Sequence, residues 1–207
     1  VLPWPEARAL LDGAGLRLAA DVVVGTDAEA RRVAERLEYP VVVKLLGPLH
    51  KTEVAGVRLS LATPEAMLAA VGELLARGDG CLVQPMIEGV EVLVGALRDP
   101  ALGAFVVLAP GGVHAELYGA RAMRPAPVSR EEAEGMLGET PGLAALVAGY
   151  RGRPPGNREA LLDTVVRVGA LAAGLGPRLR ELDLNPVIVG PDTATVVDAR
   201  IVLEARP

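Results

Sequence analysis

The sequence predicts an α+β protein built of two lobes. Helix and strand patterns alternate in short segments through the first third of the chain, and near Pro85 they give way to longer alternating strands. Apolar residues make up 51% of the 207 positions, which is enough for each lobe to bury a core. We therefore divide the chain into an N-terminal lobe, residues 1–85, and a C-terminal lobe, residues 86–207.

The elements of the first lobe follow from periodicity and capping signals. A first helix is expected over about Trp4–Gly13, and a second follows Asp27, which we take as its N-cap. Thr63 precedes Pro64 in the pattern of an N-cap and a first helical residue, which predicts a third helix. The expected strands are Val41–Leu46, Val57–Leu61 and Cys81–Gln84.

The second lobe begins with an antiparallel pair. Apolar residues alternate from Val90, and a second apolar strand, Phe105–Leu108, follows a turn. Ser129 and Glu132 have the spacing of a capping box, and a longer helix is expected over about residues 158–173. The expected closing strands are Leu182–Val189 and Thr195–Leu203.

Composition excludes several classes of protein. Lys and Arg are dispersed and aromatic residues make up 2% of the chain, so the features of a nucleic-acid-binding surface are missing. A single cysteine, Cys81, excludes an internal disulfide framework and favours a cytoplasmic location. No apolar run approaches the roughly 18 residues that span a bilayer, so no membrane association is expected. The chain starts at Val1 rather than Met, which favours a fragment or a processed chain.

Lys44 interrupts the apolar run of the strand Val41–Leu46. Burying an ammonium group costs several kcal/mol unless an anion meets it. The functional interpretation is a phosphate partner. The structural alternative is a lysine that extends from the strand end to solvent, or one that pairs with a carboxylate in the core.

His50 and Lys51 lie in a loop between strands, with glycines at both ends of it. An imidazole nitrogen can accept a phosphoryl group and pass it on, because much of it is unprotonated near neutral pH. A cation beside it suits phosphate handling. The alternative is an ordinary exposed loop histidine.

Polar residues near the C-terminus share one face of a strand. Asp183 and Asn185 alternate with leucines. If a turn joins Val189 to Ala194, the same register places Asn185 opposite Asp198, with Cβ atoms about 5 Å apart. Oxygen ligands of this kind suit Mg²⁺ that carries nucleotide phosphates.

Three further sets of charged residues allow two interpretations each. In the same register Asp183 faces Arg200, so an ordinary cross-strand ion pair is the alternative to a metal site. Glu91 lies on the face opposite its apolar neighbours and points either to solvent or into a cleft. Arg124 is a candidate for phosphate or carboxylate contact, as are two arginines of the segment Arg151–Pro155 that could equally be solvated.

Taken in order, these segments resemble the ATP-grasp module of ADP-forming acetyl- and acyl-CoA synthetases, relatives of the succinyl-CoA synthetase β chain. The resemblance covers nearly the whole chain. The segments that carry it are 39–44, 50–53, 56–59, 83–86, 89–95, 98–100, 149–155, 181–186 and 197–201. It implies an ATP-grasp fold, in which a nucleotide cleft lies between the two α+β lobes.

The resemblance also implies roles for individual residues. Lys44 would contact nucleotide phosphates, with Lys51 and Arg124 as further binding residues. Adenine would be received by the backbone of a hinge made of Gln84, Pro85 and Met86. Glu91, Asn185 and Asp198 would hold Mg²⁺ or ATP. His50 would be the catalytic residue on a swinging loop, carrying phosphate as phosphohistidine.

The implied reaction is acyl-CoA + ADP + phosphate to acid + ATP + CoA, reversibly. It requires a CoA-binding and CoA-ligase domain or α subunit, which would hold the acyl-CoA, so no turnover is expected from the chain alone. An alternative is a catalytically degenerate regulatory module of an acetyltransferase fusion, which Ala120 favours because the family has Asp there. A ligase that forms an acyl phosphate without a histidine relay is a third interpretation, and His50 in its motif opposes it.

Overall fold

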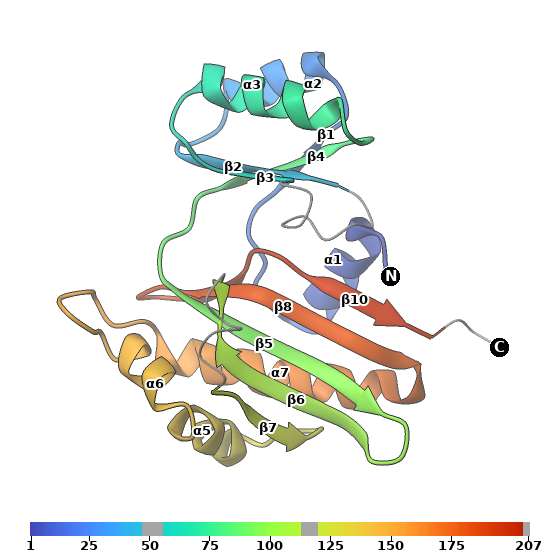
Figure 1. Cartoon of the computed structure of the whole chain (residues 1–207), viewed down its shortest axis with the longest axis vertical. Helices are drawn as coiled ribbons and strands as arrows, with labels where there is room; N and C mark the ends of the chain where they lie inside the picture. Colours follow the sequence, from blue (N-terminus) through green and yellow to red (C-terminus); the bar gives the residue numbers. More distant parts are fainter. Residues whose placement is uncertain (47–55, 113–119, 205–207) are drawn as a thin grey trace. The chain divides into compact units, whose positions relative to one another are not determined.

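The computed structural model describes residues 1–46, 56–112 and 120–204. It divides into two compact units (Figure 1). The smaller unit is Ala19–Ile87, and the larger combines Val1–Leu18 with Glu88–Pro207. The fold class predicted from the sequence, α+β, is confirmed.

The smaller unit is a four-stranded antiparallel sheet with two helices on one face (Figure 1). The strands follow the order β1-β4-β2-β3. The elements are β1 (Val22–Val24), α2 (Asp27–Ala34), β2 (Val41–Leu45), β3 (Val57–Leu61), α3 (Pro64–Leu75) and β4 (Cys81–Pro85). Thr63 caps α3 as predicted, by accepting a hydrogen bond from the Ala66 amide at 3.2 Å.

The predicted cap of α2 is wrong by one residue. The Thr26 hydroxyl accepts a hydrogen bond from the Glu29 amide at 3.2 Å, so Thr26 is the N-cap and Asp27 is the first helical residue. Both residue types cap helices well, and the hydrogen-bond geometry decides between them. Asp27 instead adds a negative charge to the first turn, where the helix dipole favours it.

The larger unit is a six-stranded antiparallel sheet in the order β10-β8-β5-β6-β7, with β9 paired to β8. Its strands are β5 (Val90–Asp99), β6 (Gly103–Pro110), β7 (Ala122–Pro125), β8 (Leu179–Val189), β9 (Ala194–Val196) and β10 (Arg200–Leu203). Its helices are α1 (Trp4–Gly13), α5 (Arg130–Gly138), α6 (Pro141–Val147), α7 (Arg158–Leu175) and the short 3-10 helix η2 (Gly176–Arg178). The strand predicted over Thr195–Leu203 is two strands, because residues 197–199 leave the ladder.

The first 18 residues belong to the larger unit, which corrects the predicted lobe of residues 1–85. The Leu2 amide donates to the Ile201 carbonyl at 2.8 Å, and the Val196 amide donates to the Arg17 carbonyl at 2.8 Å. Ala7 and Leu11 of α1 pack into the core of the larger unit. These contacts join residues nearly 200 positions apart, so the order of elements along the chain does not indicate them.

Helix α7 covers the sheet of the larger unit (Figure 1). With η2 it is long and apolar enough to cross a membrane by length and composition alone. Its apolar residues instead form part of the core beneath the sheet. They are Leu161, Leu162, Val165, Val168 and Ala172. This is the pattern of a core helix.

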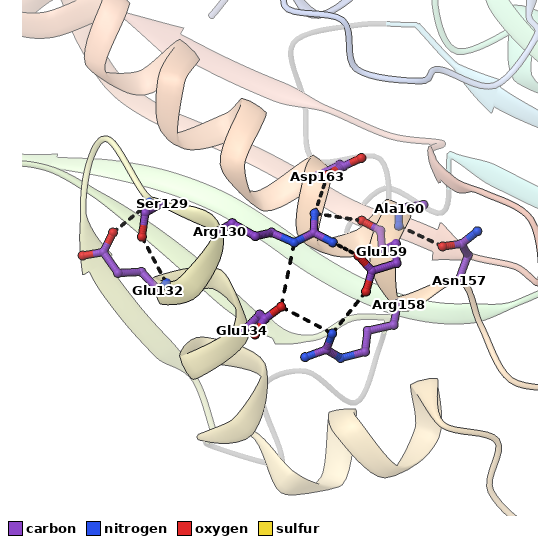
Figure 2. Close-up of polar contacts among 9 residues, drawn as sticks. All are labelled: Ser129, Arg130, Glu132, Glu134, Asn157, Arg158, Glu159, Ala160 and Asp163. Atoms are coloured by element: carbon purple, nitrogen blue, oxygen red, sulfur yellow. Dashed lines mark hydrogen bonds and ion pairs between the residues drawn. The ribbon is translucent and has the colours of Figure 1, made fainter.

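A network of ion pairs joins the first two turns of α5 to those of α7 (Figure 2). Arg130 of α5 pairs with Glu159 and Asp163 of α7, and Arg158 contacts Glu134 at 3.7 Å. Ser129 forms the predicted capping box with Glu132, with both reciprocal hydrogen bonds present at 2.7 and 3.2 Å. These ion pairs therefore link the N-terminal parts of α5 and α7.

Candidate functional site

The strand register of the larger unit places Asn185 and Asp198, the two predicted metal ligands, at opposing positions. Val189 pairs with Ala194, as predicted, and Arg200 pairs with Asp183. The register is the same on both sides of the break between β9 and β10, so Asn185 and Asp198 face each other across it. The Asp198 carboxylate also accepts a hydrogen bond from the Ala199 amide at 3.0 Å.

Two glycines that follow β6, Gly111 and Gly112, lie next to Glu91, and Gly112 also contacts Asn185. The Gly111 amide donates to the Glu91 carbonyl at 2.9 Å, which extends the pairing of β5 with β6. The next residue, Gly112, donates its amide hydrogen to Oδ1 of Asn185 at 3.2 Å. A Cβ placed on Gly112 would overlap Oε2 of Glu91. Gly112 thus contacts both Glu91 and Asn185.

These side chains lie on the face of the sheet that α7 does not cover. Val90, Val92 and Leu184 belong to the core under the helices. Because side chains alternate along a strand, Glu91 and Asn185 point to the opposite face. Glu91 is exposed, and Asn185 is partly buried.

The donor set fits a magnesium ion that is shared with a nucleotide. Mg²⁺ usually takes one or two protein carboxylates and fills its remaining positions with waters and phosphate oxygens. Asp198 supplies one carboxylate, and Oδ1 of Asn185 keeps a second lone pair after accepting from Gly112. Within the described residues no three His, Cys, Asp or Glu side chains form a cluster able to hold a metal by themselves.

In the smaller unit, Lys44 and Gln84 share the face of the sheet that the helices do not cover. Lys44 pairs with Leu82, and Gln84 pairs with Val42. The alternate residues of β2 and β4 form the core against α2 and α3. Lys44 is 6% exposed and Gln84 is 2% exposed, so both polar side chains are buried.

Gln84 carries an unsatisfied donor. Its Nε2 is a buried side-chain atom with no hydrogen-bond partner within the part of the chain that the structure describes. Leaving such a group unpaired costs about 1–3 kcal/mol. A ligand acceptor at this position would remove that cost.

The backbone of the predicted hinge is partly used by the sheet. The Met86 amide donates to the Pro40 carbonyl at 2.9 Å, so it is engaged in the β2–β4 pairing and is not available to a base. Because backbone groups alternate in direction along a strand, the Pro85 carbonyl and the Ile87 amide point away from β2.

Arg124 points to the other face of the sheet from the candidate metal ligands, so the structure gives no support to its prediction as a binding residue. It pairs with Val106, a core residue on the helix-covered face, and therefore points to that face. Its guanidinium is held by both carboxylate oxygens of Glu139 and by the Met123 carbonyl at 2.9 Å. The hydrogen bonds that Arg124 donates to Glu139 raise the pKa of Arg124 and lower that of Glu139.

The remaining candidates lie elsewhere. His50 and Lys51 fall outside the described residues. In the loop after α6, the Arg151 guanidinium lies 5.3 Å from the centre of the Tyr150 ring, in an exposed position. That stacking accounts for Arg151 without a ligand.

The two sheets and their polar faces define an ATP-grasp domain. A family model described as an ATP-grasp domain matches residues 1–203. The β subunit of ADP-forming acetate–CoA ligase I from Pyrococcus furiosus is 34% identical over 211 residues, covering 96% of this chain and 90% of the subunit. The chain belongs to this family of ADP-forming ligases, as the sequence motifs indicated.

One further relative is a longer protein that contains a similar segment, and two solved structures resemble the chain in fold. ADP-forming acetate–CoA ligase I from Archaeoglobus fulgidus is 36% identical over 96% of this chain, which spans 30% of that protein. Acetyl-coenzyme A synthetase 1 from Candidatus Korarchaeum cryptofilum, solved with coenzyme A and Ca-AMPCP, has a TM-score of 0.89 at 33% identity, with 98% of this chain and 93% of that chain covered. A structure of the same protein with Mg-AMPPCP has its phosphohistidine segment pointing towards the nucleotide binding site, with a TM-score of 0.81, 34% identity and coverage of 99% and 92%.

Proposed function

We propose that the chain is the ATP/ADP-binding component of an ADP-forming acyl-CoA synthetase, an acid–thiol ligase. The observation that carries this proposal is the constellation of Glu91, Gly112, Asn185 and Asp198 on the open face of the larger sheet. Identity to the Pyrococcus β subunit over nearly its whole length supports it. A catalytically degenerate regulatory module would have no need to keep this donor set.

Each unit carries its own set of proposed nucleotide-binding residues. Lys44 binds phosphate oxygens, and the unsatisfied Nε2 of Gln84 donates to a ring nitrogen of the base. The Pro85 carbonyl and the Ile87 amide hold the base edge in place of the Met86 amide. Asn185 and Asp198, with Glu91 beside them, would hold Mg²⁺, which would neutralise charge on the phosphate oxygens.

His50 carries the phosphoryl group. Its neutral imidazole nitrogen attacks the γ-phosphorus of ATP, a nitrogen–phosphorus bond forms, and the bond to the ADP oxygen breaks. In the other direction the phosphohistidine transfers its phosphoryl group to ADP. Lys51, next in sequence, stabilises the phosphate charge. The phosphohistidine segment of the Korarchaeum structure supports this role.

The reaction requires a partner that binds CoA. The Archaeoglobus relative, of which this chain spans 30%, supports a CoA-ligase domain or α subunit that holds the acyl-CoA. No nucleic acid or membrane partner is part of the proposal. We place the protein in the cytoplasm, and the free and buried thiol of Cys81 is consistent with a reducing compartment.

Isothermal titration calorimetry on the 207-residue chain tests the nucleotide site. ADP and ATP should bind with micromolar affinity in the presence of Mg²⁺, and EDTA should abolish the heat. Asp198→Ala should lose this Mg²⁺-dependent binding. The matched control is Asp192→Ala, because Asp192 is exposed in the turn between β8 and β9. No heat at millimolar nucleotide would reject the synthetase proposal in favour of a regulatory module.

Labelling with [γ-³²P]ATP tests the relay separately. The His50→Ala variant should keep the calorimetric affinity for Mg-ATP but lose acid-labile phosphorylation of the chain. The other histidine of the sequence, His114, provides the matched His114→Ala control. Acid-labile labelling that persists in His50→Ala would contradict the relay.

A further inference from the structure

Gly112 lies between two of the groups assigned to the metal and nucleotide. Its amide donates to Oδ1 of Asn185 at 3.2 Å, and its Cα faces the carboxylate of Glu91 so closely that a Cβ would overlap Oε2. Its φ of +74° is in the left-handed region that favours glycine. One residue therefore touches both Glu91 and Asn185, which come from different strands.

The adjacent glycine, Gly111, has a different structural role. A Cβ on Gly111 would approach the backbone nitrogen and carbon of Val92 at 2.7 Å, so Gly111 is required for close approach of two strands. Gly112 instead has only the end of a flexible side chain in the way. A methyl group at position 112 would thus displace the Glu91 carboxylate while leaving the sheet intact.

The hydrogen bond from Gly112 also sets the orientation of Asn185. Only the oxygen of a carboxamide can accept an N–H, so the bond decides which way the amide group is turned. The oxygen retains a second lone pair for a cation. Groups that orient metal ligands in this way typically change metal affinity about 10- to 100-fold when they are lost.

We propose that Gly112 is a positioning residue, which orients the Asn185 carboxamide through its amide and leaves space for the Glu91 carboxylate through its missing side chain. This inference rests on the proposed nucleotide function. It predicts that a substitution at position 112 acts on Mg²⁺ dependence through Glu91 and Asn185 and not through the stability of the fold.

Gly112→Ala is the test, and Gly103→Ala is the control. Gly103 in the same unit has a φ of +92° with nothing within 4 Å of an added Cβ, so its variant has the backbone strain without the overlap. We expect both variants to lose similar stability in urea unfolding. Only Gly112→Ala should raise the Mg²⁺ concentration for half-maximal ADP binding, by about 10- to 100-fold in calorimetry.

A double variant identifies the cause. In a Glu91→Ala background the displaced carboxylate is gone, so Gly112→Ala should add no further change in the Mg²⁺ midpoint. If Gly112→Ala alone does not fold, the double variant should fold, and its failure to do so would reject the inference. Equal Mg²⁺ midpoints for wild type and Gly112→Ala would also reject it while leaving the proposed function standing, whereas no Mg²⁺-dependent ADP binding by wild type would reject both.

Discussion

The two faces of each sheet have different compositions. Under the helices, β8 contributes Leu182 and Leu184 to the core of the larger unit, and β2 contributes Val41 and Val43 to that of the smaller one. On the opposite faces, the intervening positions carry the candidate binding residues, including Asn185 and Lys44. Core packing and the proposed ligand contacts thus fall on alternate residues of the same strands.

The faces that the helices do not cover also differ between the two sheets. Lys44 and Gln84 are almost fully buried, whereas Glu91 is exposed and Asn185 and Asp198 are partly buried. Desolvated groups make stronger contacts with charged ligands than solvated ones. Removing the side chain of Lys44 or Gln84 alone should therefore weaken binding of the base and phosphates. Mg²⁺ binding should depend more on how Glu91, Asn185 and Asp198 are positioned relative to one another.

The largest contrast should be found between Leu184 and Asn185, which are neighbours in β8. Leu184 is fully buried, so Leu184→Ala should lower the free energy of unfolding by about 2–5 kcal/mol. Asn185→Ala removes one hydrogen bond and should cost only about 0.5–1.5 kcal/mol. Urea unfolding measures both. Calorimetry should show the reverse order, with Mg²⁺-dependent ADP binding lost in Asn185→Ala and kept in folded Leu184→Ala.

Equal destabilisation by the two substitutions would mean that the open face also contributes to the core. In that case the division between the two faces of β8 would not hold.

A second contrast compares Lys44 with Arg58, which lie on neighbouring strands. Lys44→Met should weaken Mg-ATP binding about 10- to 100-fold, because a hydrogen bond from a charged group is worth about 1.5–3 kcal/mol. Arg58 is paired with Glu73 of α3 on the helix-covered side. Arg58→Met should leave the affinity for Mg-ATP unchanged in calorimetry. A similar loss in both variants would indicate a general effect of charge instead of a phosphate contact by Lys44.

Local patterns were sufficient to predict much of the fold and to select the candidate residues of the site. The pairing of Val189 with Ala194 follows from a short turn. Because β10 keeps the same register after the break at residues 197–199, this pairing also places Asn185 opposite Asp198. Lys44 was identified because a charge in an apolar run is costly. Both inferences use residues that are close in sequence or adjacent in one hairpin.

The parts that were wrong or missing depend on distant pairing. The hydrogen bond between Gly112 and Asn185 joins residues 73 positions apart. The direction of Arg124 depends on how β7 pairs with β6, and the placement of α1 depends on contacts with the far end of the chain. No local propensity encodes these contacts.

The smallest expected effect is that of Arg124→Ala. It tests whether residues on the helix-covered face of the larger sheet influence nucleotide binding at the opposite face. The Arg124 guanidinium is bound to Glu139 on the helix-covered side, so Arg124→Ala should change Mg-ATP affinity by less than about twofold in calorimetry. The pair should contribute modestly to stability. Because the hydrogen bonds from Arg124 lower the pKa of Glu139 below its usual value, this stability is present above the unfolded pKa and is lost as the pH falls through the folded one.

The difference in urea midpoint between wild type and Arg124→Ala should therefore be largest near neutral pH and should shrink below about pH 4. Glu139→Gln is the matched control, because it removes the same ion pair from the other side and should show the same pH profile. A tenfold loss of Mg-ATP affinity in Arg124→Ala but not in Glu139→Gln would show that the guanidinium reaches the nucleotide. It would also restore the role that the sequence first indicated for Arg124.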